Sequence, residues 1–455
     1  MGPQQTRAMQ RRYLPLIVLS AWLTGCSAAV TVPSTVSDDT GLPPPTRQVL
    51  ANGMRLIVQE HRAADIVALY LFVAVGARDE GPTDLGFSHF QEHMVFKGTD
   101  TQGPGFVDRA VEGAGGRSDA NTSFDYTFYS LVLPTSEASN GIQILTDMAF
   151  RSKFDSVEMA RERDVILEEA RVEQDSPDTA LTRGLNRLVF RDHPYGRSLL
   201  GSEATLKGAT RERLLAYYRR HYVPDKMTLV VVGPVAPRHI EADVQDTFGR
   251  IPPGGHRRAP LAASRPLTDG MRQDVERPEQ QAYLALGWRA PSTSDPDGFA
   301  VDLLATILGG TESSRLAQTL RDRDQLVARI TMDYNSLEAG GVVSIKAKLE
   351  AKDLDKVQRL ILDEIARIQE HGVTEDEREL ALTTFEASHA FDTETAEGLA
   401  YAYGLAETTW TLEAELMYVR RLRQVTREQI QDAARRFLSR TDYARLAFVP
   451  ARKNQ

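Results

Sequence analysis

The sequence contains one cysteine, Cys26, among its 455 residues. An intramolecular disulfide is therefore excluded, and stability has to come from the size of a packed core. The sequence also lacks a long run of lysine and arginine, because 54 basic residues are interspersed with 63 acidic ones and the formal net charge is −9. Proteins that follow a nucleic-acid backbone need concentrated positive charge. We therefore expect no nucleic-acid partner.

The apolar run near the N-terminus is short. Residues 14–23 are apolar, follow three arginines within residues 7–12, and are too few to cross a bilayer. This order is typical of a secretory signal peptide, to which we assign residues 1–25. The run is followed by Thr24-Gly25-Cys26, which resembles the lipobox of bacterial lipoproteins and predicts a lipidated Cys26. The alternative is a cysteine left over in an ordinary signal.

The residues after Cys26 indicate where such a protein would lie. Ser27 is not the acidic residue that retains many lipoproteins at the inner membrane, so we expect the periplasmic side of the outer membrane rather than of the inner one. Residues 26–46 are small, polar and proline-rich, which predicts a tether. The lipid anchor would be the only contact with a membrane.

The remaining sequence is that of a globular α+β protein. Hydrophobic residues make up 42% and charged residues 26%, and the length exceeds that of one ordinary core. Strand patterns and helix patterns follow one another in an order that repeats after a Pro/Gly/Arg-rich stretch. The predicted elements include a hairpin at Asn52-Gly53, helices at 137–151, 354–371 and 375–392, and closing strands at 227–232 and 444–449. We therefore predict related domains at 47–251 and 273–455, joined by a linker at 252–272.

One predicted helix carries a candidate metal site. It contains Phe87-Ser88-His89-Phe90-Gln91-Glu92-His93, in which residues three and four apart share a helix face. His89, Glu92 and His93 therefore project together. Two neutral imidazoles bind zinc well, and a carboxylate between them is suited to take a proton from a bound water, whose pKa zinc lowers toward about 7. The alternative is two helix histidines with ordinary hydrogen-bond partners.

A catalytic zinc site needs a third protein ligand. The predicted helix at 156–174 offers Glu162 and Glu169, which are seven residues apart and so share a face. Each of these glutamates could also be a solvated surface group. The helical geometry alone does not choose between them.

The two motifs together resemble the pitrilysin/insulinase family of zinc metallopeptidases, close to its bacterial branch that is similar to mitochondrial processing peptidase. The resemblance rests on His89-x-x-Glu92-His93 and on the later Glu162-Arg163-Asp164-Val165-Ile166-Leu167-Glu168-Glu169. Further segments resemble family landmarks from about residue 47 to residue 449: Phe96-Lys97-Gly98-Thr99, Gly115-Gly116 through Tyr129, His193-Pro194-Tyr195-Gly196, Gly201, and Leu308 to Arg321.

This resemblance implies an architecture and a set of roles. The fold would be two homologous domains per chain, each a mainly antiparallel sheet packed with helices, forming one half of a clamshell chamber. His89, His93 and Glu169 would bind Zn²⁺, Glu92 would activate the water that hydrolyses a peptide bond, and Glu162 would support the ligands. The substrates would be peptides or unfolded segments, cleaved by an endopeptidase.

The segment that contacts substrate in the family differs here. The family usually has Asn-Ala-x-Thr, whereas this chain has Asp119-Ala120-Asn121-Thr122. Residues two apart on a strand face the same way, so Asn121 could contact the substrate backbone while Asp119 adds a charge. Alternatively, Asp119 repels acidic peptides. Either interpretation predicts a strand edge to which an extended peptide adds.

The second departure lies in the C-terminal domain. In the family an Arg and a Tyr seven residues later reach the substrate across the closed chamber; Arg321 matches, but Ala328 stands at the tyrosine position. Alanine offers no hydrogen-bond donor, and Tyr334 is out of register. We therefore expect a homologous partner that supplies the tyrosine in a heterodimer, with a homodimer as the alternative. The competing functional hypothesis is a non-catalytic or weakly active assembly subunit, against which the intact His-x-x-Glu-His and distal glutamate argue.

Overall fold

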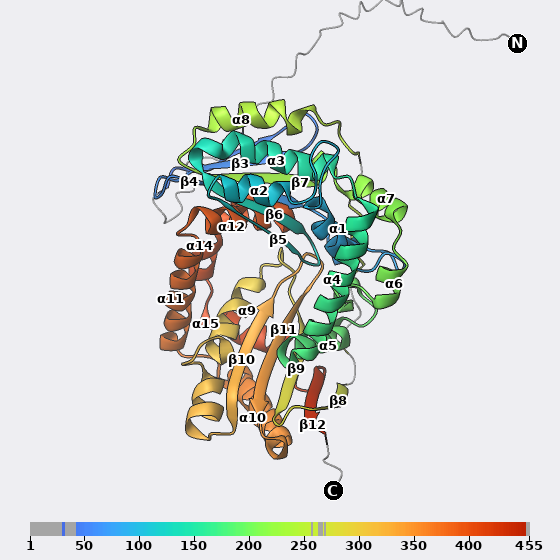
Figure 1. Cartoon of the computed structure of the whole chain (residues 1–455). Coiled ribbons are helices and arrows are strands. Elements are labelled where there is room, and N and C mark those ends of the chain that lie inside the picture. Colours follow the sequence, from blue (N-terminus) through green and yellow to red (C-terminus); the bar gives the residue numbers. More distant parts are fainter. Residues whose placement is uncertain (1–29, 32–41, 256–257, 263–266, 268–269, 452–455) are drawn as a thin grey trace, which may run out of the picture.

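The computed structural model describes residues 30–31, 42–255, 258–262, 267 and 270–451 (Figure 1). The predicted signal peptide, Cys26 and most of the tether lie outside the described residues. Within the tether, Val30–Thr31 (β1) pairs antiparallel with Thr46–Val49 (β2). Across these described ranges, no helix combines the length and the apolar character that a membrane span requires.

The first sheet has seven strands in the order β1-β2-β3-β7-β4-β6-β5. Its remaining strands are β3 (Arg55–Glu60), β4 (Ile66–Val73), β5 (Arg117–Thr122), β6 (Thr127–Pro134) and β7 (Met227–Gly233). β3 and β7 run parallel and the other neighbours are antiparallel, so the predicted mainly antiparallel sheet is confirmed. The β2–β3 hairpin turns at Asn52-Gly53, as predicted, and Gly53 takes the positive φ of 88° that favours glycine.

Helices cover one face of this sheet (Figure 1). The helices of this domain are α1 (Phe87–Val95), α2 (Phe106–Gly113), α3 (Ala138–Arg151), α4 (Ser156–Asp175), α6 (Glu203–Lys207), α7 (Arg211–His221) and α8 (Pro237–Asp246). Of these, α1, α2, α3 and α8 contact strands of the sheet, and α4 packs on α1. The core joins Leu69 and Leu71 of β4 to Phe87 and Phe90 of α1 and Leu145 of α3. Burial of these side chains therefore fixes the orientation of α1 on the sheet.

The sheet of the second domain repeats the order β5-β6-β4-β7-β3 of the first sheet. Its sheet runs β10-β11-β9-β12-β8, built from β8 (Met271–Arg277), β9 (Ala282–Ala290), β10 (Val327–Asn335), β11 (Gly341–Leu349) and β12 (Ala444–Pro450). β8 and β12 are parallel, as β3 and β7 are, and the other neighbours are antiparallel. Its helices are α9 (Gly298–Ala305), α10 (Leu354–His371), α11 (Glu375–Asp392), α13 (Leu412–Leu416), α14 (Tyr418–Arg423) and α15 (Arg427–Phe437).

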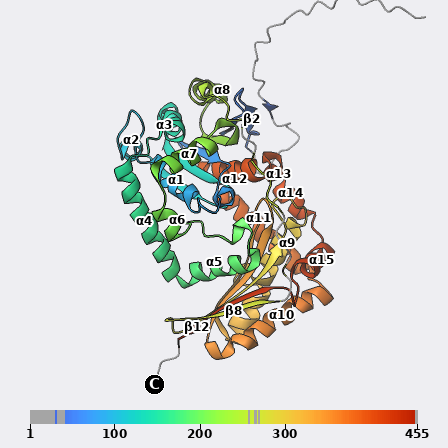
Figure 2. The same ribbon diagram turned by 90° about the vertical axis from the view of Figure 1, so that its right-hand side faces the viewer.

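The domains exchange one helix each. α5 (Pro177–Phe190) follows α4 but packs on β9 and β12 of the second sheet, while α12 (Ala396–Thr409) packs on β4 and β7 of the first. Figure 2 shows α5 beside the second domain. Glycine permits both close approaches, because a Cβ at Gly184 would lie 2.5 Å from Leu446 and one at Gly404 would lie 2.2 Å from Phe72. The two cores are thus completed by each other's chain segments.

Candidate metal centre

Helix α1 is held so that its polar face remains free. Phe87, Phe90 and Met94 are buried in the first core, which turns His89 and His93 away from the sheet. At the N-terminus of α1 the carboxylate of the buried Glu80 accepts the backbone N–H groups of Gly86 and Ser88, both at 2.8 Å. These donors have no partner within the helix, so Glu80 caps it. This role of Glu80 was not predicted from the sequence.

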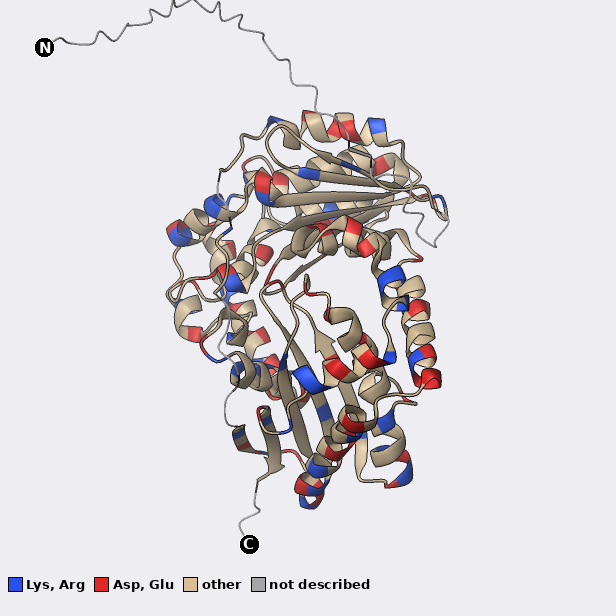
Figure 3. Cartoon of the chain, turned by 180° about the vertical axis from the view of Figure 1, so that it is seen from behind, with Lys and Arg blue, Asp and Glu red and all other residues tan. Residues whose placement is uncertain are grey.

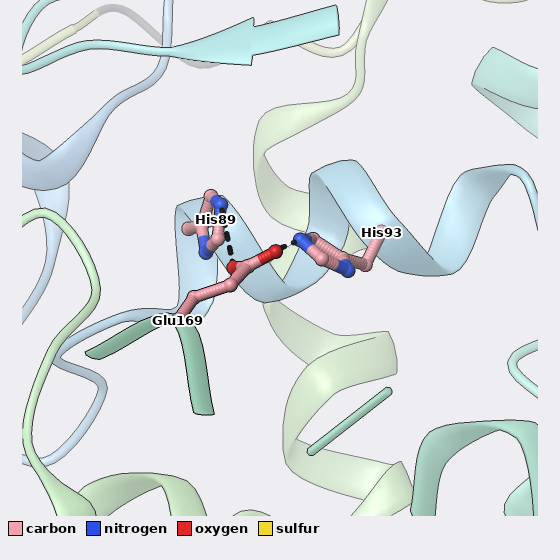
Figure 4. Close-up of side chains that lie close together, drawn as sticks. All are labelled: His89, His93 and Glu169. Atoms are coloured by element: carbon pink, nitrogen blue, oxygen red, sulfur yellow. Dashed lines mark ion pairs between the residues drawn. The ribbon is translucent and has the colours of Figure 1, made fainter. Parts of the chain in front are cut away.

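The three predicted ligands converge between α1 and α4 (Figure 4). The Nε2 atoms of His89 and His93 lie 3.8 Å and 3.6 Å from Oε2 of Glu169. One candidate ligand atom from each residue lies within 4.8 Å of the others, and no other such group of histidine, cysteine or acidic residues occurs in the described part of the chain. Glu169 is the most accessible of the three, with 43% of its side chain exposed.

The pKa of His89 favours the metal-binding form of that residue, whereas the pKa of His93 shifts in the opposite direction. Burial, assisted by the neighbouring His93, lowers the pKa of His89 to about 3, so this imidazole is neutral at neutral pH. Burial also opposes charge on His93, but the carboxylates of Glu162, Glu169 and Glu92 outweigh it and raise the pKa of His93. A neutral imidazole is the form that binds a metal. Two ring nitrogens and one carboxylate form a donor set that Zn²⁺ accepts, with room for a fourth ligand.

Glu162 lies behind the ligands and not among them. Its Oε2 lies 2.9 Å from Nδ1 of His93, and its Oε1 lies 2.9 Å from Nζ of Lys97. A proton on Nδ1 of His93 leaves Nε2 free to face Glu169. The supporting role of Glu162 stays a prediction of the family resemblance, and its contact with Lys97 was not predicted.

Glu92 extends from the same helix toward strand β5. The hydroxyl of Thr122 donates a hydrogen bond to Oε2 of Glu92 at 2.5 Å. Burial raises the pKa of Glu92 to about 7, partly offset by this hydrogen bond and by His93. A carboxyl group with that pKa exchanges protons readily near neutral pH. Thr122 belongs to the segment Asp119-Ala120-Asn121-Thr122, but the sequence alone did not reveal its contact with Glu92.

Strand β5 is the outer strand of the first sheet, as predicted for the substrate segment. Asp119 and Asn121 are both exposed and face the same side, whereas Thr122 is buried beside α1. An exposed strand edge offers backbone groups to an extended peptide. The prediction of a strand edge is therefore confirmed.

The predicted residues of the second domain lie apart from this cluster. The guanidinium of Arg321 makes ion pairs with Glu312 and Asp322. Ala328 lies at a bulge near the start of β10. The hydroxyl of Tyr334 donates to the carbonyl oxygen of Pro291 at 3.0 Å, so it is engaged within its own domain.

A cavity of about 1090 Å³ lies between the two domains and reaches β5. Arg117, Ser118 and Asp119 of β5 line it, together with residues of β6, α9, α11 and α12. In the view of Figure 3, acidic and basic residues are interspersed along the helices.

Two family models match consecutive parts of the chain. Residues 55–203 match insulinase (peptidase family M16), and residues 208–385 match the peptidase M16 inactive domain. An uncharacterized zinc protease of Rickettsia felis is 30% identical over 72% of this chain and 79% of its own length. A probable mitochondrial-processing peptidase subunit beta of Arabidopsis thaliana is 27% identical over 71% of this chain and 63% of its own length.

Solved structures show the same fold. A protease from Helicobacter pylori superposes with a TM-score of 0.86 at 20% identity, covering 90% of this chain and 100% of its own. The periplasmic protease PqqL of Escherichia coli gives a TM-score of 0.75 at 22% identity, covering 92% of this chain but 48% of its own. The fold and both sequence models agree with the resemblance that the two helix motifs indicated. The chain belongs to the insulinase family of peptidases, peptidase family M16.

Proposed function

We propose that this chain is a zinc-dependent endopeptidase that hydrolyses peptides or unfolded segments. The observation that carries the proposal is the convergence of His89, His93 and Glu169, with Glu92 on the same face of α1. Relatives named zinc proteases support the assignment at the level of the family. A zinc ion held by these three side chains would supply Lewis-acid chemistry and acidify water.

The residues of the chain supply the remaining steps. Glu92 takes a proton from the water while the water oxygen adds to the carbonyl carbon of the peptide bond. Glu92 then passes that proton to the amine nitrogen as the C–N bond breaks. Glu162 holds the His93 ring in the orientation that turns Nε2 toward Glu169. The edge of β5 binds the peptide as an added strand, with Asp119 and Asn121 beside it.

The experiment distinguishes the role of a metal ligand from the role of the general base. We expect the soluble mature protein to contain about one zinc per chain, and Glu92→Gln to retain that zinc but lose hydrolysis. Glu169→Gln should lose zinc, whereas Glu168→Gln, on the exposed side of the same helix, should change neither property. Metal analysis and cleavage of an unstructured peptide measure both. Full activity in Glu92→Gln would remove Glu92 from the mechanism, and bound zinc with no hydrolysis under any pairing would favour the non-catalytic assembly subunit.

The proposal includes a second subunit. The chain corresponds in fold to half of PqqL, which supports a chamber completed by another chain of this architecture. Arg321 would reach the partner's site, and the absence of a tyrosine at Ala328 favours a heterodimer over a homodimer. We also propose that lipid on Cys26 anchors the protein at the periplasmic side of a membrane, with the outer membrane favoured over the inner one.

A further inference from the structure

The proposed base and the proposed peptide-binding edge meet at one residue. Thr122 is the last residue of β5 and is 5% exposed. Its side chain lies on the opposite face of the strand from Asn121, because successive side chains alternate along a strand. It therefore reaches Glu92 of α1, while Asp119 and Asn121 remain accessible.

The hydrogen bonds around Thr122 determine which acceptor receives its hydroxyl proton. The hydroxyl of Thr127, which pairs with Thr122 across the β5–β6 hairpin, donates to the carbonyl oxygen of Val75 at 3.0 Å. The two threonine hydroxyls are 3.4 Å apart, and Glu92 accepts from Thr122 at 2.5 Å. A hydroxyl has one proton to donate, so the proton of Thr122 is directed to Oε2 of Glu92.

This contact leaves the other carboxylate oxygen for the reaction. Within the described part of the chain, no hydrogen bond engages Oε1 of Glu92. A carboxylate fixed through one oxygen presents the other in a defined direction, which is what a general base needs. Strand β5 is also fixed at its other end, where Nε of Arg117 donates to Glu397 of α12 at 2.9 Å.

We propose that Thr122 is a positioning residue, which orients Glu92 and links it to the strand on which the peptide binds. The inference rests on the proposed function, because it assigns Glu92 as the base. The peptide that pairs with β5 and the Glu92 carboxylate are then both held by the same strand. The hydrogen bond thereby restrains the Glu92 side chain relative to the strand that binds the peptide.

Three variants of the full mature chain test this role. Thr122→Val keeps the shape of the side chain but removes the donor, and should lower kcat on the order of tenfold, the worth of one hydrogen bond. KM and zinc content should not change, because neither the outer edge of β5 nor a ligand is altered. Thr122→Ser should restore kcat. The matched control is Thr127→Val, which removes a buried hydroxyl from the same hairpin without contacting Glu92 and should retain wild-type kcat.

Several outcomes would overturn the proposal. A wild-type kcat in Thr122→Val would show that Glu92 needs no such donor. Equal losses of kcat in Thr122→Val and Thr127→Val would indicate a general effect on packing. Loss of zinc in Thr122→Val, or a kcat that Thr122→Ser does not restore, would indicate the same. Failure of the underlying function is distinguishable, because the wild-type chain would then cleave no peptide, alone or with a partner.

Discussion

Removal of the Glu162 carboxylate is expected to weaken zinc binding although Glu162 is not a ligand. Its two oxygens lie 2.9 Å from His93 and 2.9 Å from Lys97, and the residue is 7% exposed. In Glu162→Ala the Nδ1 atom of His93 loses its partner. The ring is then free to rotate or to change tautomer, and its basicity falls.

The magnitude follows from the kind of interaction that the alanine variant removes. Removal of a hydrogen-bond partner behind a metal-binding histidine typically weakens metal binding by about 10- to 100-fold, which is about 1.4–2.7 kcal/mol. Glu162→Gln should have a smaller effect, because its amide oxygen still accepts a hydrogen bond from His93 but carries no charge. Lys97→Met leaves the His93–Glu162 hydrogen bond in place and should bind zinc nearly as tightly as the wild type.

Competition with a chelator of known affinity measures the zinc Kd of each purified apoprotein. Denaturant unfolding of the same samples shows whether the alanine variant is still folded. Wild-type zinc affinity in a folded Glu162→Ala chain would refute the reasoning. An equal loss in Lys97→Met would instead place the effect in the ion pair with lysine.

Three further predictions concern other parts of the chain. Cys26→Ser should release the protein from membranes without changing its unfolding transition, and cell fractionation that finds the unsubstituted protein wholly soluble would contradict lipidation. Ala328→Tyr should raise the activity of a homodimer by about a hundredfold or more if the missing donor limits it; an unchanged rate in a fully active homodimer would argue against a heterodimer. Burial raises the pKa of Asp302 to about 7, above its unfolded value near 3.8, so ionisation destabilises the fold increasingly as pH rises from about 4 to about 7. Asp302→Asn should therefore stabilise the protein more at pH 8 than at pH 5, and a gain independent of pH in urea unfolding would contradict this.

Much of the fold follows from local sequence patterns. The Asn52-Gly53 hairpin, the amphipathic helices α3, α10 and α11, and the closing strands β7 and β12 all coincide with predicted segments. The repeated order of these segments also predicted two related units, which the matching strand orders bear out. These features depend on periodicity and turn chemistry, which a single sequence contains.

The helices α5 and α12 were not predicted, and the reason is physical. α5 begins at Pro177 directly after α4, and Ser176 both ends one helix and caps the next. Proline starts a helix readily but disrupts one that it interrupts, so the local signal is a break and not a second helix. The exchange itself depends on contacts between segments far apart in sequence, such as Gly404 with Phe72.

The same distinction applies to the candidate site. His89, Glu92 and His93 share a face because of helical spacing alone, which made them predictable. The choice of Glu169 over Glu162 needed the family resemblance, since both glutamates lie on one face of α4. The contacts of Thr122, Lys97 and Glu80 arise from tertiary packing, and no spacing rule connects them with α1.

The position of Glu169 depends on both domains, although all three candidate ligands belong to the first. Helix α4 begins at a cap in the first domain, where Asp155 accepts the N–H groups of Val157 and Glu158. Its other end is held by the second domain, because Arg277 of β8 donates to the carbonyl oxygen of Gln174 at 3.1 Å. α5 then packs on the second sheet immediately beyond that end. A helix fixed at both ends places the carboxylate of Glu169 against the histidines of α1 with little freedom, so the exchange of helices stabilises the site as well as the interface between the domains.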